Sequence, residues 1–132
     1  MTFYEQEINR IREAIYSNEG QVNTAIGIRN FIEQNYESDL NLEILSKMQF
    51  VSKYHLIRLF KQYYGQTPRQ YLIDKRIAKA KEQLSKGMSV TETCFAVGFS
   101  SLGSFSTLFK TRTGSSPGAY RKAQLSRSNS KS

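Results

Sequence analysis

A short segment near the middle of the chain gathers side chains suited to contacting a nucleic acid. Arg58 can donate two hydrogen bonds to a guanine, Ile57 can touch a thymine methyl group, and Tyr54 can pack against sugars or bases. Lys53 and Lys61 add positive charge of the kind that phosphates attract. These residue types and their spacing favour a surface that contacts both bases and phosphates.

Residues that commonly carry catalysis or hold metals are sparse. His55 is the only histidine and has no His, Cys or carboxylate at ligand spacing, so we assign it to phosphate binding or to structure. Cys94 is the only cysteine; it cannot form a disulfide within the chain, and its apolar run TCFAV predicts burial. There is also no Gly-rich phosphate loop. We therefore expect no metal, no cofactor and no enzyme activity.

Helical periodicity places the first cluster on a helix over residues 53–64. Its predicted buried face recurs at helical spacing and consists of Leu56, Leu59, Phe60 and Tyr63. The remaining positions face outward, namely Lys53, Tyr54, Ile57, Arg58, Lys61 and Gln62.

The rest of the chain is predicted to be helical as well. The expected helices run over residues 3–17, 24–36, 41–48, 68–86, 89–97, 102–113 and 117–121, with a break at Gly20 to Asn23. Inward positions are expected at Ile28, Phe31, Ile32, Leu42, Leu45, Met48, Ile73, Ile77, Ala80, Leu84, Phe105, Leu108 and Phe109. Residues 123–132 are polar and weakly basic, and we expect them to be disordered.

The first predicted helix carries an apolar stripe of Tyr4, Ile8, Ile11 and Ile15. We expect this stripe to pack on the rest of the domain. Self-association through the stripe is the alternative.

The chain repeats itself. GQTPRQY at 65–71 returns as GSSPGAY at 114–120, and the match extends from HLIRLFKQYYGQTPRQYL at 55–72 to SFSTLFKTRTGSSPGAYR at 104–121. Each copy reads as a short helix, a turn and a longer helix that ends at a Gly and is followed by a hydroxyl cap and Pro. Gly65 fits the left-handed position that ends a helix, and Thr67 and Ser116 are the expected caps of the helices that follow. Asn41 is the expected cap of the helix that ends at Met48. This is the pattern of a helix-turn-helix unit. The intervening helix of 68–86 would be about 28 Å long, comparable with the roughly 34 Å between successive major grooves.

Charge is segregated along the chain. The formal net charge is +8, and residues 52–132 hold fifteen basic and three acidic residues, whereas residues 1–51 hold four and eight. If the lysines served only to keep the protein soluble, they would not need to be confined to one part of the chain. The segregation therefore favours a polyanionic partner. No apolar run approaches the length of a membrane span, and the start MTFYEQEIN does not read as a secretory signal. We expect no membrane partner and a cytoplasmic, nucleoid-associated protein.

Two segments carry a resemblance to a known family, LSKMQFVSKYHLIRLFKQYYGQTPRQYLIDKRIAKAKEQL and VTETCFAVGFSSLGSFSTLFKTRTGSSPGAYRK. They resemble the AraC/XylS-type bacterial transcription regulators over about residues 24–122. The resemblance implies an all-α, seven-helix DNA-binding domain with two helix-turn-helix subdomains joined by a long linker helix, preceded here by an extra N-terminal helix. It also suggests either a bare DNA-binding regulator or part of a longer protein.

The expected organisation has five segments. They are an N-terminal extension over 1–23, a first helix-turn-helix subdomain over 24–67, a linker helix over 68–86, a second subdomain over 87–122 and a basic tail over 123–132.

Matching family positions contact bases, which strengthens the assignment of Tyr54, Ile57 and Arg58. In the second unit the outward positions are Ser101, Gly103, Ser104 and Thr107, where Thr107 replaces an Arg often found in the family. Short hydroxyls make weak base contacts, so we expect this unit to contribute mainly anchoring and shape readout. The candidate phosphate contacts are Lys53, Lys61, Lys110, Arg112, Arg121 and Lys122.

The first turn departs from the family pattern. Phe50 stands where the second unit has Gly98 and where the family commonly has Gly, so we expect a distorted or repacked turn.

The sequence therefore predicts a regulator that binds double-stranded promoter DNA with sequence specificity through two recognition helices in successive major grooves. We expect an activator that binds DNA as a monomer and touches RNA polymerase, with a dimer through the N-terminal helix as the alternative. The competing function is a protein-interaction module that acts on RNA polymerase or another regulator and has only non-specific affinity for DNA.

Overall fold

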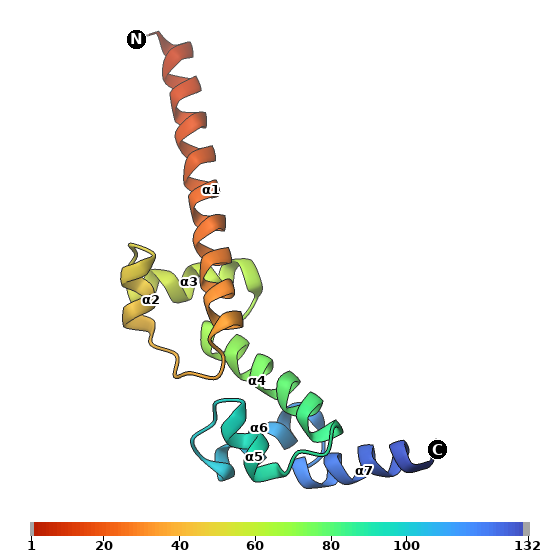
Figure 1. Cartoon of the computed structure of the whole chain (residues 1–132). Helices are drawn as coiled ribbons and strands as arrows, with labels where there is room; N and C mark the ends of the chain where they lie inside the picture. The colour runs from red at the N-terminus through yellow and green to blue at the C-terminus, as the bar shows by residue number, and fades with distance from the viewer. Residues whose placement is uncertain (1, 131–132) are drawn as a thin grey trace. The chain divides into compact units, whose positions relative to one another are not determined.

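A computed structural model describes residues 2–130, with the backbone alone described for residues 15–17 and 130 (Figure 1). Within this range the chain forms seven α-helices and no strands. The helices are α1 Phe3–Gln34, α2 Leu42–Met48, α3 Lys53–Tyr64, α4 Pro68–Ser85, α5 Val90–Ala96, α6 Leu102–Thr113 and α7 Pro117–Ser130. The predicted all-α fold with two helix-turn-helix units, a long linker helix and an extra N-terminal helix is confirmed.

The helices form two compact units. The first contains residues 1–31 and 41–68, and the second contains residues 32–40 and 69–132. The linker helix α4 therefore packs as part of the second unit rather than standing apart from it. The five-segment division expected from the sequence stays a prediction.

The N-terminal helix is continuous, and the predicted break at Gly20 to Asn23 is wrong. Glycine inside a helix costs only about 1 kcal/mol relative to Ala. Thr24 Oγ1 donates a hydrogen bond to the Gly20 carbonyl. Gln21 accepts one from the Tyr63 hydroxyl of α3 at 3.4 Å, a contact between residues far apart in the sequence. One turn later, α1 buries Ala25 and Ile28 in the first unit.

The apolar stripe of α1 does not pack on the domain as predicted. Tyr4, Ile8 and Ile11 are 75%, 39% and 55% exposed, and the side chain of Ile15 lies outside the described residues. No described side chain from Thr2 to Asn23 is buried. The stripe therefore has no partner among the described parts of the chain.

The first unit is built around α2 and α3, which pack against each other. Asn41 caps α2 as predicted, because its side chain accepts a hydrogen bond from the Ile44 amide at 3.1 Å. The buried side chains include Leu45, Leu56, Leu59 and Phe60. Two predicted inward positions are wrong: Met48 and Tyr63 are 53% and 37% exposed.

The turn between α2 and α3 keeps the hydrogen-bond pattern of its counterpart in the second unit. Phe50 is 96% exposed, so the turn is not repacked, and the expected distortion is limited to the backbone of Phe50 itself. The Phe50 amide donates to the Lys47 carbonyl at 3.2 Å and the Val51 amide to Ser46 at 3.1 Å. Forty-eight residues later, Gly98 donates to Phe95 at 3.2 Å and Phe99 to Cys94 at 3.0 Å. Phe50 achieves this with a φ of 56°, in the left-handed region that disfavours bulky side chains.

The second unit has an aromatic core. Ile77, Ala80 and Leu84 of α4 pack with Cys94, Val97, Phe99, Phe105 and Phe109, and the stripe predicted for this helix is confirmed. The rings of Phe99, Phe105, Phe109 and Tyr120 follow one another at centroid distances of 5.2 to 5.7 Å. Such aromatic pairs add to the stabilisation from burial.

A buried arginine secures the segment between α1 and α2 within the second unit. Arg76 Nε donates to the Tyr36 carbonyl at 2.7 Å and Nη2 donates to the Ser38 carbonyl at 2.8 Å. Its guanidinium lies 5.4 Å from the centre of the Phe99 ring, and burial lowers its pKa. Gly98 is required beside it, since a Cβ there would lie 2.8 Å from the Tyr36 carbonyl oxygen.

The last helix extends to Ser130, beyond the predicted end near Arg121. Its first turn is fixed by the contact of Tyr120 with Phe109 and by the predicted cap, in which Ser116 Oγ accepts from the Ala119 amide at 3.2 Å. Residues 123–130 are therefore helical rather than disordered, and the last part of the predicted tail, residues 131–132, lies outside the described residues. No described helix is both long and apolar enough to cross a membrane.

Candidate nucleic-acid interface

Helix α3 presents the first candidate surface. Its N-cap is Ser52, whose side chain accepts a hydrogen bond from the His55 amide at 3.1 Å. Three buried residues of the helix, Leu56, Leu59 and Phe60, fix its rotation about its own axis. As a result Tyr54 is 78% exposed.

The other candidate positions of α3 follow from the same rotation. Arg58 and Lys61 are exposed, and Ile57 is half-buried. Tyr54, Ile57 and Arg58 are thus gathered on one helix face as predicted, with a cationic side chain beside an aromatic one.

Local electrostatics distinguish the remaining α3 candidates. Lys53 Nζ lies 3.9 Å from Glu43 Oε1 of α2, so an acidic neighbour already reduces the positive potential there. This pair is solvent-exposed and contributes little to stability. His55 is half-buried beside the start of the helix. The described residues contain no group of three His, Cys, Asp or Glu side chains placed to hold a metal.

Helix α6 presents the second candidate surface. Ser101 is its N-cap, and its Oγ accepts a hydrogen bond from the Ser104 amide at 3.3 Å. This local role occupies one acceptor site of a hydroxyl that we had assigned to base contact. Gly103, Ser104 and Thr107 are exposed and, with Leu108, line a shallow hollow along the helix. This surface offers small polar groups and bare backbone, as the sequence predicted.

The predicted phosphate contacts of the second unit have different environments. Lys110 and Lys122 are exposed on α6 and α7. Arg112 forms an ion pair with Asp74 of α4. Arg121 is half-buried, and its Nε and Nη2 donate to the carbonyls of Met88 and Gly87 at 3.1 and 3.0 Å. Lys110 and Lys122 are therefore the more accessible pair.

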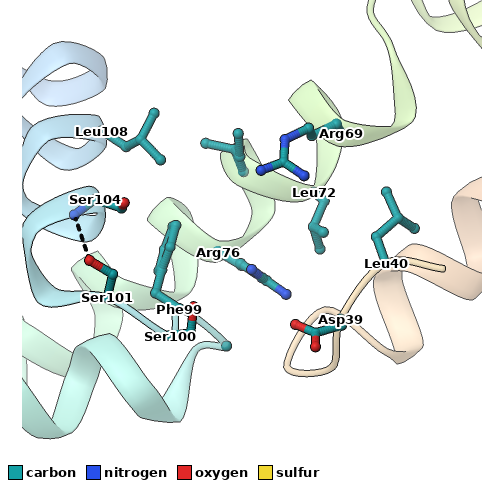
Figure 2. Close-up of a pocket in the computed structure, with 12 residues that line it drawn as sticks. Asp39, Leu40, Arg69, Leu72, Arg76, Phe99, Ser100, Ser101, Ser104 and Leu108 are labelled. Atoms are coloured by element: carbon teal, nitrogen blue, oxygen red, sulfur yellow. Dashed lines mark hydrogen bonds between the residues drawn. The ribbon is translucent and has the colours of Figure 1, made fainter.

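A polar cavity of about 360 Å³ lies within the second unit, beside the start of α6 (Figure 2). Its polar lining comes from Asp39, Arg69, Arg76, Ser100, Ser101 and Ser104. Figure 2 shows the Arg76 side chain between Phe99 and Asp39. Arg69 is an exposed basic residue of this lining that was not among the predicted contacts. Its position directly after Pro68, in the first turn of a predicted helix, could have identified it.

A family model described as a helix-turn-helix domain matches residues 45–123 and covers both candidate surfaces. An AraC-type DNA-binding-domain transcriptional regulator from Chromobacterium violaceum superposes with a TM-score of 0.67, at 27% identity over 83% of this chain and 96% of that structure. The chain belongs to the AraC family of transcription regulators.

Two further comparisons agree with a DNA-binding transcription regulator. The DNA-binding domain of the global transcriptional factor AdpA, solved in complex with a target DNA, superposes with a TM-score of 0.73 and 28% identity over 78% of this chain and 94% of that one. An HTH-type transcriptional regulator in the cgkA 5′ region of Pseudoalteromonas carrageenovora is 37% identical over 92 residues. That alignment covers 70% of this chain and 55% of the relative, so the chain spans about half of the relative's length.

Proposed function

We propose that this chain is a sequence-specific regulator that binds double-stranded promoter DNA by inserting α3 and α6 into successive major grooves. The observation that carries the proposal is the repeated turn, whose two copies share their hydrogen bonds and each lead into a helix with an exposed polar face. A helix held in this way can approach base edges while its opposite face remains in the core. The AdpA domain bound to its target DNA supports the same role for this chain.

Within this proposal the two helices have different tasks. Arg58 and Tyr54 give α3 the side chains that discriminate bases, so sequence preference comes mainly from the first unit. Ser104, Thr107 and the backbone at Gly103 make α6 a surface for close approach and shape readout. Lys61, Lys110 and Lys122 contact phosphates.

We also propose that the regulator acts as an activator and contacts RNA polymerase. Exposed apolar side chains on the α2 side of the first unit support a protein contact, since Ile44, Met48 and Phe50 are 52%, 53% and 96% exposed. One chain carries both recognition helices, so one chain occupies one site. These exposed residues also favour the competing function, a protein-interaction module with non-specific DNA affinity.

The deciding experiment selects bound sites from a random duplex pool and then measures affinity for the selected site and for scrambled DNA. Two half-sites about one helical turn apart are expected. If all six candidate cations contact phosphates, namely Lys53, Lys61, Lys110, Arg112, Arg121 and Lys122, affinity should fall roughly a thousandfold between 50 and 200 mM salt, and it should fall less if only the three accessible lysines do. A weak salt dependence without site enrichment would favour the protein-interaction module. Transcription in vitro from a promoter that carries the selected site distinguishes an activator from a repressor.

Two substitutions separate base reading from phosphate anchoring. Arg58→Ala should cost about 1 to 3 kcal/mol on the selected site and relax preference at one base position. Lys110→Ala should weaken binding to all sequences alike. The control is Gln62→Ala, an exposed change on α3 at an unassigned position. An equal loss on all sequences for Arg58→Ala would assign it to a phosphate, and a base-selective loss for Lys110→Ala would contradict its assignment.

A further inference from the structure

The unpartnered face of α1 follows a heptad repeat. Counting from Ile8 as position a, the β-branched residues Ile8, Ile15 and Val22 occupy successive a positions. The d positions hold Tyr4, which precedes Ile8, and Ile11 and Asn18, which lie between the a positions. We call these six residues, Tyr4, Ile8, Ile11, Ile15, Asn18 and Val22, the α1 seam.

The seam is exposed along its length wherever side chains are described. Tyr4, Ile8, Ile11 and Val22 are each more than a third exposed. Packing of α1 within its own unit begins where the seam ends, since Gln21 bonds to Tyr63 and Ala25 is buried. A row of large apolar side chains in water along three heptads is unfavourable and marks a contact surface.

The charges beside the seam identify its occupant. Glu7 lies at a g position and Arg12 at the following e position. In a parallel pair of helices, g faces the next e of the partner, so Glu7 of each copy would face Arg12 of the partner subunit. Glu7 is bonded to Arg10 of its own helix, and a carboxylate can accept from both guanidiniums.

The antiparallel arrangement is disfavoured by the same residues. With the seam fully overlapped, e positions face e positions, which places Arg12 against Arg12 of the partner subunit and Glu5 against Glu19 of the partner subunit. These are repulsive pairs. In the parallel arrangement Asn18 faces Asn18 of the partner subunit, and the two amides can bond to each other and fix the register.

We propose that α1 pairs with α1 of a second copy of this chain as a parallel two-stranded coiled coil over residues 4–22. β-branched residues at a favour two strands when Leu fills d, whereas the seam has Ile11 at d, so the mass from sedimentation equilibrium decides the number of strands. The pairing uses no surface assigned to DNA, so each chain of the pair keeps both recognition helices. Two copies joined in this way would deliver two double helix-turn-helix units together.

Sedimentation equilibrium of the full chain without DNA tests the pairing. The chain should show a concentration-dependent dimer, and Ile11→Gln should weaken the dimer at least about tenfold because it removes two buried apolar side chains. Glu13→Gln, at an f position outside the seam, is the matched control and should leave it unchanged. The described part of this helix segment buries no side chain within its own chain, so unfolding curves should coincide for all three proteins at concentrations far below the dimer dissociation constant. At higher concentrations the wild type and Glu13→Gln should gain stability and Ile11→Gln should gain less. A wild-type chain that sediments only as a monomer would overturn the proposal.

A charge exchange tests the parallel register. Glu7→Arg should weaken the dimer about tenfold, because two attractive pairs become repulsive. Adding Arg12→Glu should restore it, while Glu13→Arg alone should have little effect. Failure of the double substitution to restore association would contradict the assigned register.

Cross-linking tests orientation independently. Tyr4→Cys should form a disulfide-linked dimer under mild oxidation, because equal positions face each other only in a parallel pair. The native Cys94 is fully buried and does not compete. Cross-linking only in the combined Tyr4→Cys and Val22→Cys variant would indicate antiparallel pairing and refute the proposal. None of these results depends on DNA binding, so they stand apart from the test of the proposed function.

Discussion

Phe50 allows a direct test of backbone strain in the first turn. Its φ of 56° costs a non-glycine residue about 1 to 2 kcal/mol, while its side chain is 96% exposed and gains little from burial. Phe50→Gly removes the strain but adds freedom to the unfolded chain, which costs about 0.5 to 1 kcal/mol. The variant should therefore be more stable by about 0.5 to 1 kcal/mol, which corresponds to a Tm higher by roughly 2 to 6 °C.

The equivalent glycine of the second turn should respond in the opposite direction. Gly98 has a φ of 106°, and an added Cβ would lie within 2.9 Å of the carbonyl oxygens of Tyr36 and Glu37 and of Arg76 Nε. Gly98→Ala therefore combines a strained backbone with overlaps between the new Cβ and backbone carbonyl oxygens. We expect a loss of about 2 to 4 kcal/mol.

Denaturant unfolding followed by circular dichroism measures both effects. Phe50→Ala is the control, because it removes the ring and keeps the Cβ, and it should change stability by less than about 0.5 kcal/mol. Phe50→Asn should gain stability, since Asn tolerates the left-handed region and adds less unfolded-state freedom than Gly. A loss of stability in Phe50→Gly that matches the loss in Phe50→Ala would show that the ring stabilises the turn and that the strain argument is wrong.

Two further substitutions test the second unit. Gly103→Ala should raise stability by about 0.5 to 1 kcal/mol, because its Cβ would meet only Ser101 Oγ at an ordinary 3.8 Å. The same substitution should lower affinity for the selected DNA site. Unchanged affinity in a binding titration would argue against close approach of the backbone at Gly103 to DNA. Arg76→Leu should cost about 1 to 3 kcal/mol in chemical unfolding, since it removes the donor to the partly buried Tyr36 and Ser38 carbonyls. Arg69→Leu, an exposed change in the lining of the same cavity, should stay within about 0.5 kcal/mol, and an equal loss in both variants would refute the role given to Arg76.

Local chemistry was the part of the fold that could be predicted. Asn41 and Ser116 were assigned as helix caps, and both accept the expected amide hydrogen bonds. Gly65 was assigned as a left-handed helix end, and its φ is 72°. These features depend on residues within a few positions of one another, so the sequence contains the information needed to predict them.

Failures of prediction occurred where distant residues decide. The continuity of α1 through Gly20 depends in part on Tyr63, forty-two positions from Gln21. The extension of α7 contains Leu125, which is half-buried near Gly87, thirty-eight positions away. Helical periodicity alone identifies an apolar stripe but does not say what covers it, which is why the exposure of Ile11 was not foreseen.

The candidate interface divides in the same way. The exposure of Tyr54 and Arg58 follows from the spacing of Leu56, Leu59 and Phe60 on a single helix, so it was predictable. Arg121 bonds to the Gly87 and Met88 carbonyls more than thirty residues away, which only the folded chain reveals. Its assignment to phosphate stays a prediction, as do the other base and phosphate contacts.

Because Cys94 is buried, the reactivity of its thiol reports local unfolding of the second unit. This residue is the only cysteine of the chain, it is completely buried among Phe105, Phe109 and their neighbours, and burial raises the pKa of its thiol. A thiol reagent can reach it only when the core around α5 and α6 separates. The rate of modification in the unaltered protein therefore reports how often the unit that carries one recognition helix comes apart, with and without DNA, and requires no engineered label.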